Sequence, residues 1–183
     1  MMNERYLQSA RLLLRAPEPE DLEMMYRLEN ASEVWSVSNT TVPFSRYVLR
    51  KYIINCQNDI YTDHELRLMI QPTVDECQHA VGTVDLIDFM PLHGRAEVGI
   101  AIMESYRKQG YAQEALELLC NYAFSLLHLN QLYAYVRVDN VASLSLFEKC
   151  GFSQKVLLKQ WINDGAGGYK DAYLIQRLST FSV

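Results

Sequence analysis

Residues 97–113 read E-V-G-I-A-I-M-E-S-Y-R-K-Q-G-Y-A-Q. The segment predicts a short apolar strand, a tight basic loop containing Gly110, and the start of a long amphipathic helix. Backbone N–H groups in the first turn of a helix have no partner within the helix, and the helix dipole makes that end positive. A bound anion satisfies both. The segment therefore predicts an anion site, to which Arg107 and Lys108 add positive charge.

This loop does not match two common phosphate-binding motifs. It lacks the G-x-x-x-x-G-K-[ST] pattern of a P-loop. Its glycine spacing also differs from that of a dinucleotide-binding turn, and the strands before it predict a meander rather than a βαβ unit. Taken alone, the loop is also compatible with a simple strand-to-helix turn with a basic surface.

Size and composition exclude several classes of protein. The chain has 183 residues, 49% apolar and 21% charged, which is typical of a globular domain with a buried core. A net charge of −5 argues against a nucleic-acid partner. No Cys/His spacing predicts a metal site, no signal peptide is evident, and no apolar run approaches the roughly 20 residues that span a bilayer. We therefore expect a cytoplasmic protein with no metal and no membrane segment.

Hydrophobic periodicity predicts the order β-α-α-β-β-β-α-β-α-β-β over a single domain, residues 1–183. Three consecutive strands with short turns predict an antiparallel meander, and the strand–helix–strand unit that follows adds a parallel pair. The sequence thus predicts an α/β (α+β) fold with a mixed, mostly antiparallel sheet and helices on both faces. The expected strands are 9–15, 64–71, 80–89, 95–102, 131–138, 152–161 and 169–178, and the expected longer helices are 19–29, 45–58 and 111–128, with a short helix capped by Asn140.

The ordered features resemble those of the GNAT N-acetyltransferases. The matching segments are R-K-Q-G-Y-A (107–112), N-V-A-S (140–143) and L-F-E-K-C-G-F (146–152), and the resemblance extends from Leu12 to Leu178. Two further segments, L-L-L-R-A-P-E-P-E-D-L (12–22) and G-R-A-E-V-G-I (94–100), are similar to the branch of spermidine/polyamine and ribosomal-protein-alanine N-acetyltransferases.

The resemblance implies acetyl-CoA as the acetyl donor. Its pyrophosphate would rest on backbone amides of the 107–113 loop, and its pantetheine would pair with the backbone of residues 100–102 like an extra strand. Asn140 would bond the pantetheine arm, although it can also be a simple helix cap. The implied cofactor contacts are Ile100, Ala101, Ile102, Arg107, Lys108, Gln109, Gly110, Tyr111, Ala112, Gln113, Asn140 and Phe147.

The implied reaction is direct attack of a neutral amine on the thioester. Because a free amine has a pKa near that of lysine, about 10.4, a base must assist, directly or through water. Glu97 is the candidate, since it lies just before the cofactor segment and matches the glutamate in the R-A-E-F pattern of the polyamine enzymes. The alternative is a structural Glu97 paired with Arg95 or another basic group.

Phe147 departs from the family pattern. Many relatives have tyrosine at this position, which can protonate the leaving thiolate, whereas phenylalanine has no hydroxyl. Candidate replacements are Tyr111, Tyr133, Tyr135, Ser143 or a water molecule, whereas Cys150 reads as a buried small side chain. The branch that acetylates ribosomal-protein alanine also often lacks this tyrosine, so Phe147 favours that branch.

The acceptor is less defined by the sequence. The segment 37–44 has no carboxylate, unlike the corresponding loop of the bacterial polyamine enzymes, so an allosteric polyamine site is not indicated. Glu29, Glu33 and Trp35 are the candidate acceptor contacts. The sequence favours an N-acetyltransferase for a small polyamine-type amine; the alternatives are acetylation of protein N-termini and a non-catalytic acyl-CoA-binding module. Dimers are common in the family, so we also expect a homodimer.

Overall fold

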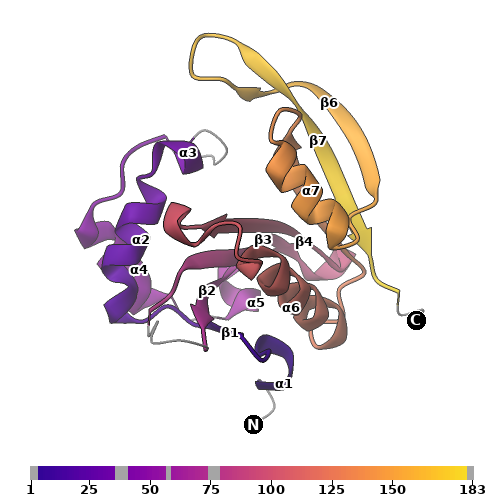
Figure 1. Cartoon of the computed structure of the whole chain (residues 1–183). Helices are drawn as coiled ribbons and strands as arrows, with labels where there is room; N and C mark the ends of the chain where they lie inside the picture. Colours follow the sequence, from indigo (N-terminus) through magenta and orange to yellow (C-terminus); the bar gives the residue numbers. More distant parts are fainter. Residues whose placement is uncertain (1–3, 36–40, 57–58, 74–78, 181–183) are drawn as a thin grey trace.

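The computed structural model describes residues 4–35, 41–56, 59–73 and 79–180. One seven-stranded sheet has the order β1-β2-β3-β4-β5-β7-β6 (Figure 1). Neighbouring strands are antiparallel except β4 and β5, which confirms the predicted mixed sheet. The strands are β1 Leu12–Arg15, β2 Leu66–Pro72, β3 Gly82–Met90, β4 Arg95–Ile102, β5 Gln131–Arg137, β6 Gln154–Asn163 and β7 Tyr169–Leu178.

The helices include the predicted ones and three of a single turn. Their bounds are α1 Glu4–Leu7, α2 Leu22–Glu29, α3 Ser32–Trp35, α4 Arg46–Asn55, α5 Ile60–Asp63, α6 Tyr111–Ser125 and α7 Val141–Lys149. The short helices α1, α3 and α5 were not predicted, because four residues carry too little periodicity to stand out from a loop. Ser45 caps α4 as expected by accepting the Val48 N–H at 3.2 Å, but the helix ends at Asn55 rather than near residue 58.

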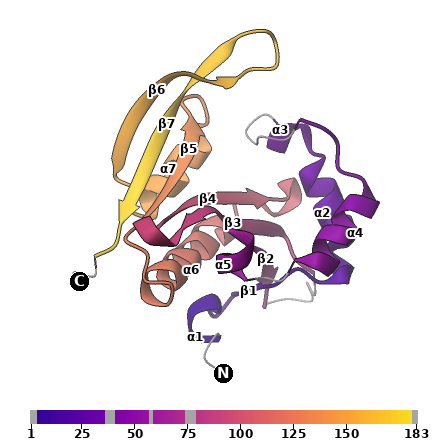
Figure 2. The ribbon, with the colours of Figure 1, turned by 180° about the vertical axis from the view of Figure 1, so that it is seen from behind.

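Strand alternation divides the core between the two faces of the sheet. Leu68, Val84 and Val98 lie on the face covered by α6, which is in front of the sheet in Figure 1 and behind it in Figure 2. On the other face, α2 and α4 pack against β2 residue Met69. The apolar spacing of residues 45–58 places Val48 and Leu49 together in one stripe, but α4 turns Leu49 inward and leaves Val48 48% exposed.

The parallel pair β4–β5 splits part-way along its length. Its register runs only from Arg95–Gln131 to Glu97–Tyr133. Beyond that point β4 continues beside β3 to Ile102, and β5 continues beside β7 to Arg137. We call this separation the fork. It leaves one edge of β4 after Glu97 free to pair with an extended ligand, as a strand would.

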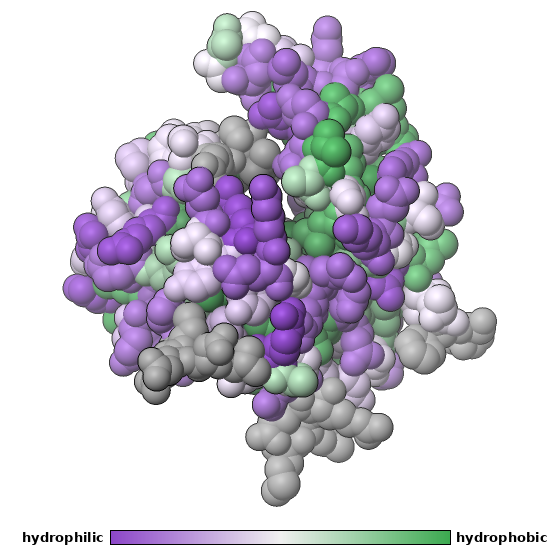
Figure 3. All heavy atoms as spheres, in the orientation of Figure 1, coloured by the Kyte–Doolittle hydropathy of each residue, from purple (hydrophilic) through white to green (hydrophobic). Residues whose placement is uncertain are grey.

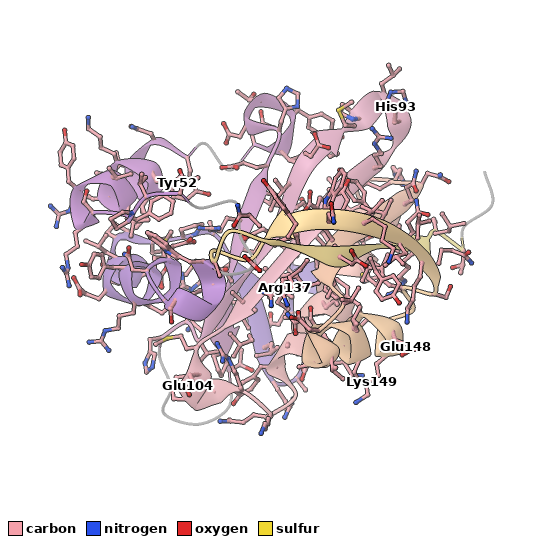
Figure 4. The ribbon with its side chains drawn as sticks, turned by 90° about the horizontal axis from the view of Figure 1, so that it is seen from above. Tyr52, His93, Glu104, Arg137, Glu148 and Lys149 are labelled. Carbon is pink, nitrogen blue, oxygen red and sulfur yellow. The ribbon has the colours of Figure 1, made fainter. Side chains whose placement is uncertain are left out.

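The β6–β7 hairpin extends well beyond the rest of the sheet. The space-filling view shows a hollow between this hairpin and the part of the molecule built from α2, α3 and α4 (Figure 3). From above, the hairpin passes over the β3–β4 strands, whereas Tyr52 lies on the α4 side (Figure 4). The fork therefore opens into a cleft with walls from two separate parts of the chain.

Candidate active site

The first part of the site is the loop that leads into α6. Within the described part of the chain, the backbone N–H groups of residues 108–113 donate to no protein acceptor, and backbone bonding resumes with the Glu114 N–H to the Gly110 carbonyl at 3.2 Å. Lys108 (φ 62°) and Gly110 (φ 87°) adopt left-handed conformations that turn the chain tightly here. The loop thus presents successive free donors at a helix N-terminus, the arrangement expected of a phosphate cradle.

A close neighbour, as well as the backbone angle, favours glycine at position 110. A Cβ at this position would lie 3.2 Å from Nη2 of Arg11. Arg11 reaches the loop from just before β1, and its Nε and Nη2 both donate to Oε2 of Glu114, at 2.9 and 2.7 Å. The guanidinium also lies 5.6 Å from the centre of the Tyr111 ring. Arg11 thus adds a positive charge beside the cradle that the sequence pattern did not single out.

Three side chains of the predicted cofactor set are buried or bonded within the protein. Tyr111 is buried in the core, and Gln113 donates to Glu117 at 2.9 Å. Arg107 donates from Nε to the Ile102 carbonyl at 3.0 Å, which closes the end of β4. The cradle is therefore made by the main chain, with apolar or locally bonded side chains around it.

The start of α7 lies on the other branch of the fork. Oδ1 of Asn140 accepts the Ser143 N–H at 3.1 Å, so the predicted helix cap is present. Phe147 is only 3% exposed and meets Phe152 edge-on, with ring centroids 4.9 Å apart. The structure thus places Phe147 in the core, on the buried side of α7.

Glu97 stands at the last paired position before the fork opens, opposite Tyr133. It is half-buried, and it has no hydrogen bond or ion pair among the described residues. Nε of Arg95 is buried without an acceptor, so the alternative of a Glu97–Arg95 pair is not realised there. Burial raises the pKa of Glu97 above its ordinary value, and the negative charge of nearby Asp88 raises it further. A carboxylate of raised pKa is a better base.

Asp88 reaches the same face through a β-bulge. The register of β3 with β4 passes from Ile87–Glu97 to Met90–Arg95, and Asp88 has a left-handed φ of 49°. A bulge changes the face to which a side chain points and is common beside active sites. Ile87 is the residue that pairs with Glu97. In a regular strand Asp88 would point to the opposite face from Ile87, so strand alternation alone does not bring Asp88 and Glu97 together.

Tyr133 joins these two carboxylates. Its hydroxyl donates to Oδ2 of Asp88 at 2.6 Å. Burial, the bond to Asp88 and the nearby charge of Glu97 raise the pKa of the phenol above its ordinary value, so it stays protonated. Because this proton is already donated to Asp88, Tyr133 is poorly placed to protonate a leaving thiolate.

A buried charge network lies farther along the same face. Arg67 bonds both oxygens of Asp85, at 2.9 and 3.0 Å, and forms an ion pair with Glu29 from α2. Burial alone would lower the pKa of Arg67, but the two carboxylates hold it above its ordinary value. This network ties α2, β2 and β3 together, and the sequence analysis did not predict it.

The three predicted acceptor contacts, Glu29, Glu33 and Trp35, do not form one group in the structure. The Glu29 carboxylate is engaged by Arg67, while its backbone carbonyl accepts the indole N–H of Trp35 at 2.7 Å. Glu33 lies in α3, and its side chain is outside the described part. The segment 37–44 is described only from Thr41 onward, so half of that segment lies outside the described residues. Glu29 and Asp85 are paired with Arg67 on this side, whereas Asp88 accepts from Tyr133 and Glu97 has no ion-pair partner among the described residues.

Comparison with known proteins identifies the family. Residues 11–153 match the family described as acetyltransferase (GNAT) domain. This chain is a GNAT N-acetyltransferase. The GNAT family uses acetyl-CoA, so the forked β4–β5 pair and the amide cradle of this GNAT enzyme are candidate contacts for the acetyl donor.

The GNAT chain is similar to spermidine N(1)-acetyltransferase of Vibrio cholerae, with 27% identity over 92% of this chain and 95% of the relative. Spermidine N(1)-acetyltransferase of Escherichia coli is 31% identical over 76% of this chain and 72% of its own length. A crystal structure of the Vibrio cholerae enzyme in complex with CoA and spermine superposes with a TM-score of 0.82. It shares 26% identity and covers 94% of this chain and 98% of that one.

The described part of the GNAT chain lacks two kinds of feature. No helix there is long and apolar enough to cross a membrane. No cluster of three or more His, Cys, Asp or Glu side chains is arranged there to hold a metal ion.

Proposed function

We propose that this GNAT enzyme transfers the acetyl group of acetyl-CoA to a primary amine of a small, linear polycation such as spermidine. The observation that carries the proposal is the position of Glu97, an unpaired carboxylate within the described residues, at the point where β4 and β5 separate. The free edge of β4 and the amide cradle lie along the same strand-to-helix segment. The acetyl donor and the candidate base would therefore meet at the fork.

In the proposed reaction, the neutral amine nitrogen attacks the thioester carbonyl carbon. A C–N bond forms, the C–S bond breaks, and the amine proton passes to Glu97 directly or through water. The departing CoA thiolate takes a proton in turn. Tyr111 is buried in the core and Tyr133 is engaged with Asp88, so Tyr135, Ser143 and water remain as proton donors.

The charge of the acceptor side supports a cationic acceptor. Glu97 and Asp88 form no ion pair among the described residues, and opposite charges attract strongly where water is partly excluded. The relatives support the same class, since the Vibrio cholerae enzyme is described with spermine bound. A protein N-terminus is the second candidate, because the cleft beneath the hairpin is open enough to accept an extended chain.

The test is a measurement of CoA thiol release with a panel of acceptors: spermidine, an aminoglycoside, and peptides that begin with Ala or Ser. We expect the highest kcat/KM with spermidine. Turnover with peptides alone would favour N-terminal acetylation. Binding of acetyl-CoA with no turnover on any acceptor would favour the acyl-CoA-binding module. Homodimer formation stays a prediction, to be checked by sedimentation or light scattering.

A further inference from the structure

Three aromatic side chains lead from the fork toward the raised hairpin. The rings of Tyr133 and Tyr135 meet edge-on, with centroids 5.8 Å apart, and Tyr135 stacks on Trp161 at 5.8 Å with an interplanar angle of 25°. We call these three residues the aromatic row. Its inner end lies beside Glu97, and its outer end is open, since Trp161 is 54% exposed.

The position of Trp161 depends on an irregularity in β6. The register with β7 passes from Leu158–Ala172 to Ile162–Lys170, so β6 has extra residues here, and Gln160 has a left-handed φ of 51°. Asp171 holds this bulge. Its Oδ1 accepts the Gln160 N–H at 2.9 Å, and its Oδ2 accepts from Lys159 at 2.8 Å. Bulges change the direction of side chains, and this one accompanies an indole stacked on Tyr135.

A large exposed aromatic side chain on an edge strand carries a risk of aggregation. Folding of the hairpin does not require the indole there, because β6 is almost wholly exposed and buries little apolar surface. Tyr133 and Tyr135 lie in β5 and Trp161 lies in β6, so the row joins the fork to the hairpin. An acceptor bound with its amine at Glu97 would extend along these rings.

We propose that the aromatic row binds the distal part of the acceptor, so that the enzyme selects linear amines with a second positive charge several bonds from the reacting nitrogen. This rests on the proposed function. Methylene groups pack on ring faces, and an ammonium group is attracted to the face of an indole. Glu97 and Asp88 at the inner end would attract the reacting amine. Aromatic selection of a distal cation would discriminate among amines, which carboxylates near the reacting end alone would not.

One neighbouring cation must be considered. Arg137 follows Tyr135 on the same face of β5 and would repel an ammonium group. Its Nε and Nη2 donate to the two oxygens of Asp139, at 2.9 and 2.7 Å, so the positive charge is largely balanced. The outer end of the row therefore carries no strong net positive charge from this residue.

The test compares kcat/KM for spermidine and for n-butylamine in the full chain. Trp161→Leu should lower kcat/KM for spermidine about three- to tenfold through KM. The value for n-butylamine and the KM for acetyl-CoA should change less than twofold. Trp161→Phe should retain most of the preference. Tyr169→Leu is the matched control, because Tyr169 is exposed on the same hairpin and takes part in no ring contact among the described residues.

A second pair of variants tests the bulge. Asp171→Ala should reproduce the effect of Trp161→Leu, whereas Asp171→Asn keeps an oxygen for the Gln160 N–H and should retain the preference. Equal losses for spermidine and n-butylamine, or no loss for either, would overturn the aromatic row as an acceptor site while leaving acetyl transfer intact. Absence of transfer from the unmodified enzyme to any amine would overturn the proposed function as well.

Discussion

The two sides of the fork differ in the groups that form them: one consists of main-chain groups and the other of side chains. The cofactor side consists of backbone groups from one continuous segment, the end of β4 and the loop into α6. The proposed acceptor side consists of side chains from six elements, α2, β2, β3, β4, β5 and β6. A site made of main chain tolerates many side chains, whereas a site made of side chains depends on register and on bulges. Substitutions should therefore separate the two sides.

The largest effect is expected from Glu97→Gln. Loss of a general base should lower kcat about 100- to 10,000-fold with little change in acetyl-CoA affinity. Activity of the unmodified enzyme should fall as the pH drops through the raised pKa of Glu97, and this acidic limb should be absent from the variant. A pH–rate profile checks both; an unchanged profile would remove Glu97 from catalysis.

The same substitution should lower activity but raise stability at neutral pH. The stability measurement therefore serves as a control for misfolding. Because the folded state raises the pKa of Glu97, its ionisation opposes folding, and stability is lost as the pH rises through that pKa. Glu97→Gln should therefore raise Tm at pH 7 but not near pH 4. A lower Tm at pH 7 would mean that the activity loss reflects misfolding.

Arg67→Met tests the acceptor side next. It leaves Asp85 and Glu29 without their shared cation, which should cost about 3–5 kcal/mol of stability. Denaturant unfolding measures the cost. Adding Glu29→Gln and Asp85→Asn should restore part of the stability, because it removes the two carboxylates that have lost their cation. A loss that these added substitutions do not reduce would point to lost packing instead.

Gly110→Ala tests the cofactor side. A left-handed φ costs an L-residue about 1–2 kcal/mol, and the added Cβ would press on Arg11. Calorimetry should show acetyl-CoA binding weakened by about tenfold, because a cost of about 1–2 kcal/mol corresponds to roughly that change in Kd. Gly165→Ala is the matched control, since Gly165 has φ 76° in the hairpin loop with nothing within 4 Å. Equal acetyl-CoA affinity in both variants would argue against the cradle.

The smallest effect is expected from Asn140→Ala, which removes the cap of α7 and should cost about 1 kcal/mol. Asn140→Asp keeps the cap, because its carboxylate accepts the Ser143 N–H, but it cannot donate a hydrogen bond. If Asn140 also donates to the pantetheine arm, the Asp variant should keep its Tm and show a higher KM for acetyl-CoA. An unchanged KM would leave Asn140 as a cap alone.

Much of the fold was predictable because it is encoded locally. The alternation of Leu12 and Leu14, the cap at Ser45 and the left-handed Gly151 each act within a few residues of their own position. The one-turn helices and the outward position of Val48 were missed or wrong. Four residues give no period, and the buried face of α4 is chosen by its partner α2 and not by its own pattern.

The candidate site also has one part that follows from local sequence and another that depends on the tertiary structure. The sequence by itself determined the amide cradle and the place of Glu97, because a glycine-containing loop between a strand and a helix leaves free N–H groups wherever it occurs. Only the tertiary structure decided that Asp88 turns toward Glu97, that Arg67 holds Asp85 and Glu29, and that Trp161 stacks on Tyr135. The physical reason is that two bulges reset the strand alternation, and residues far apart in the chain meet only once the register between strands is fixed.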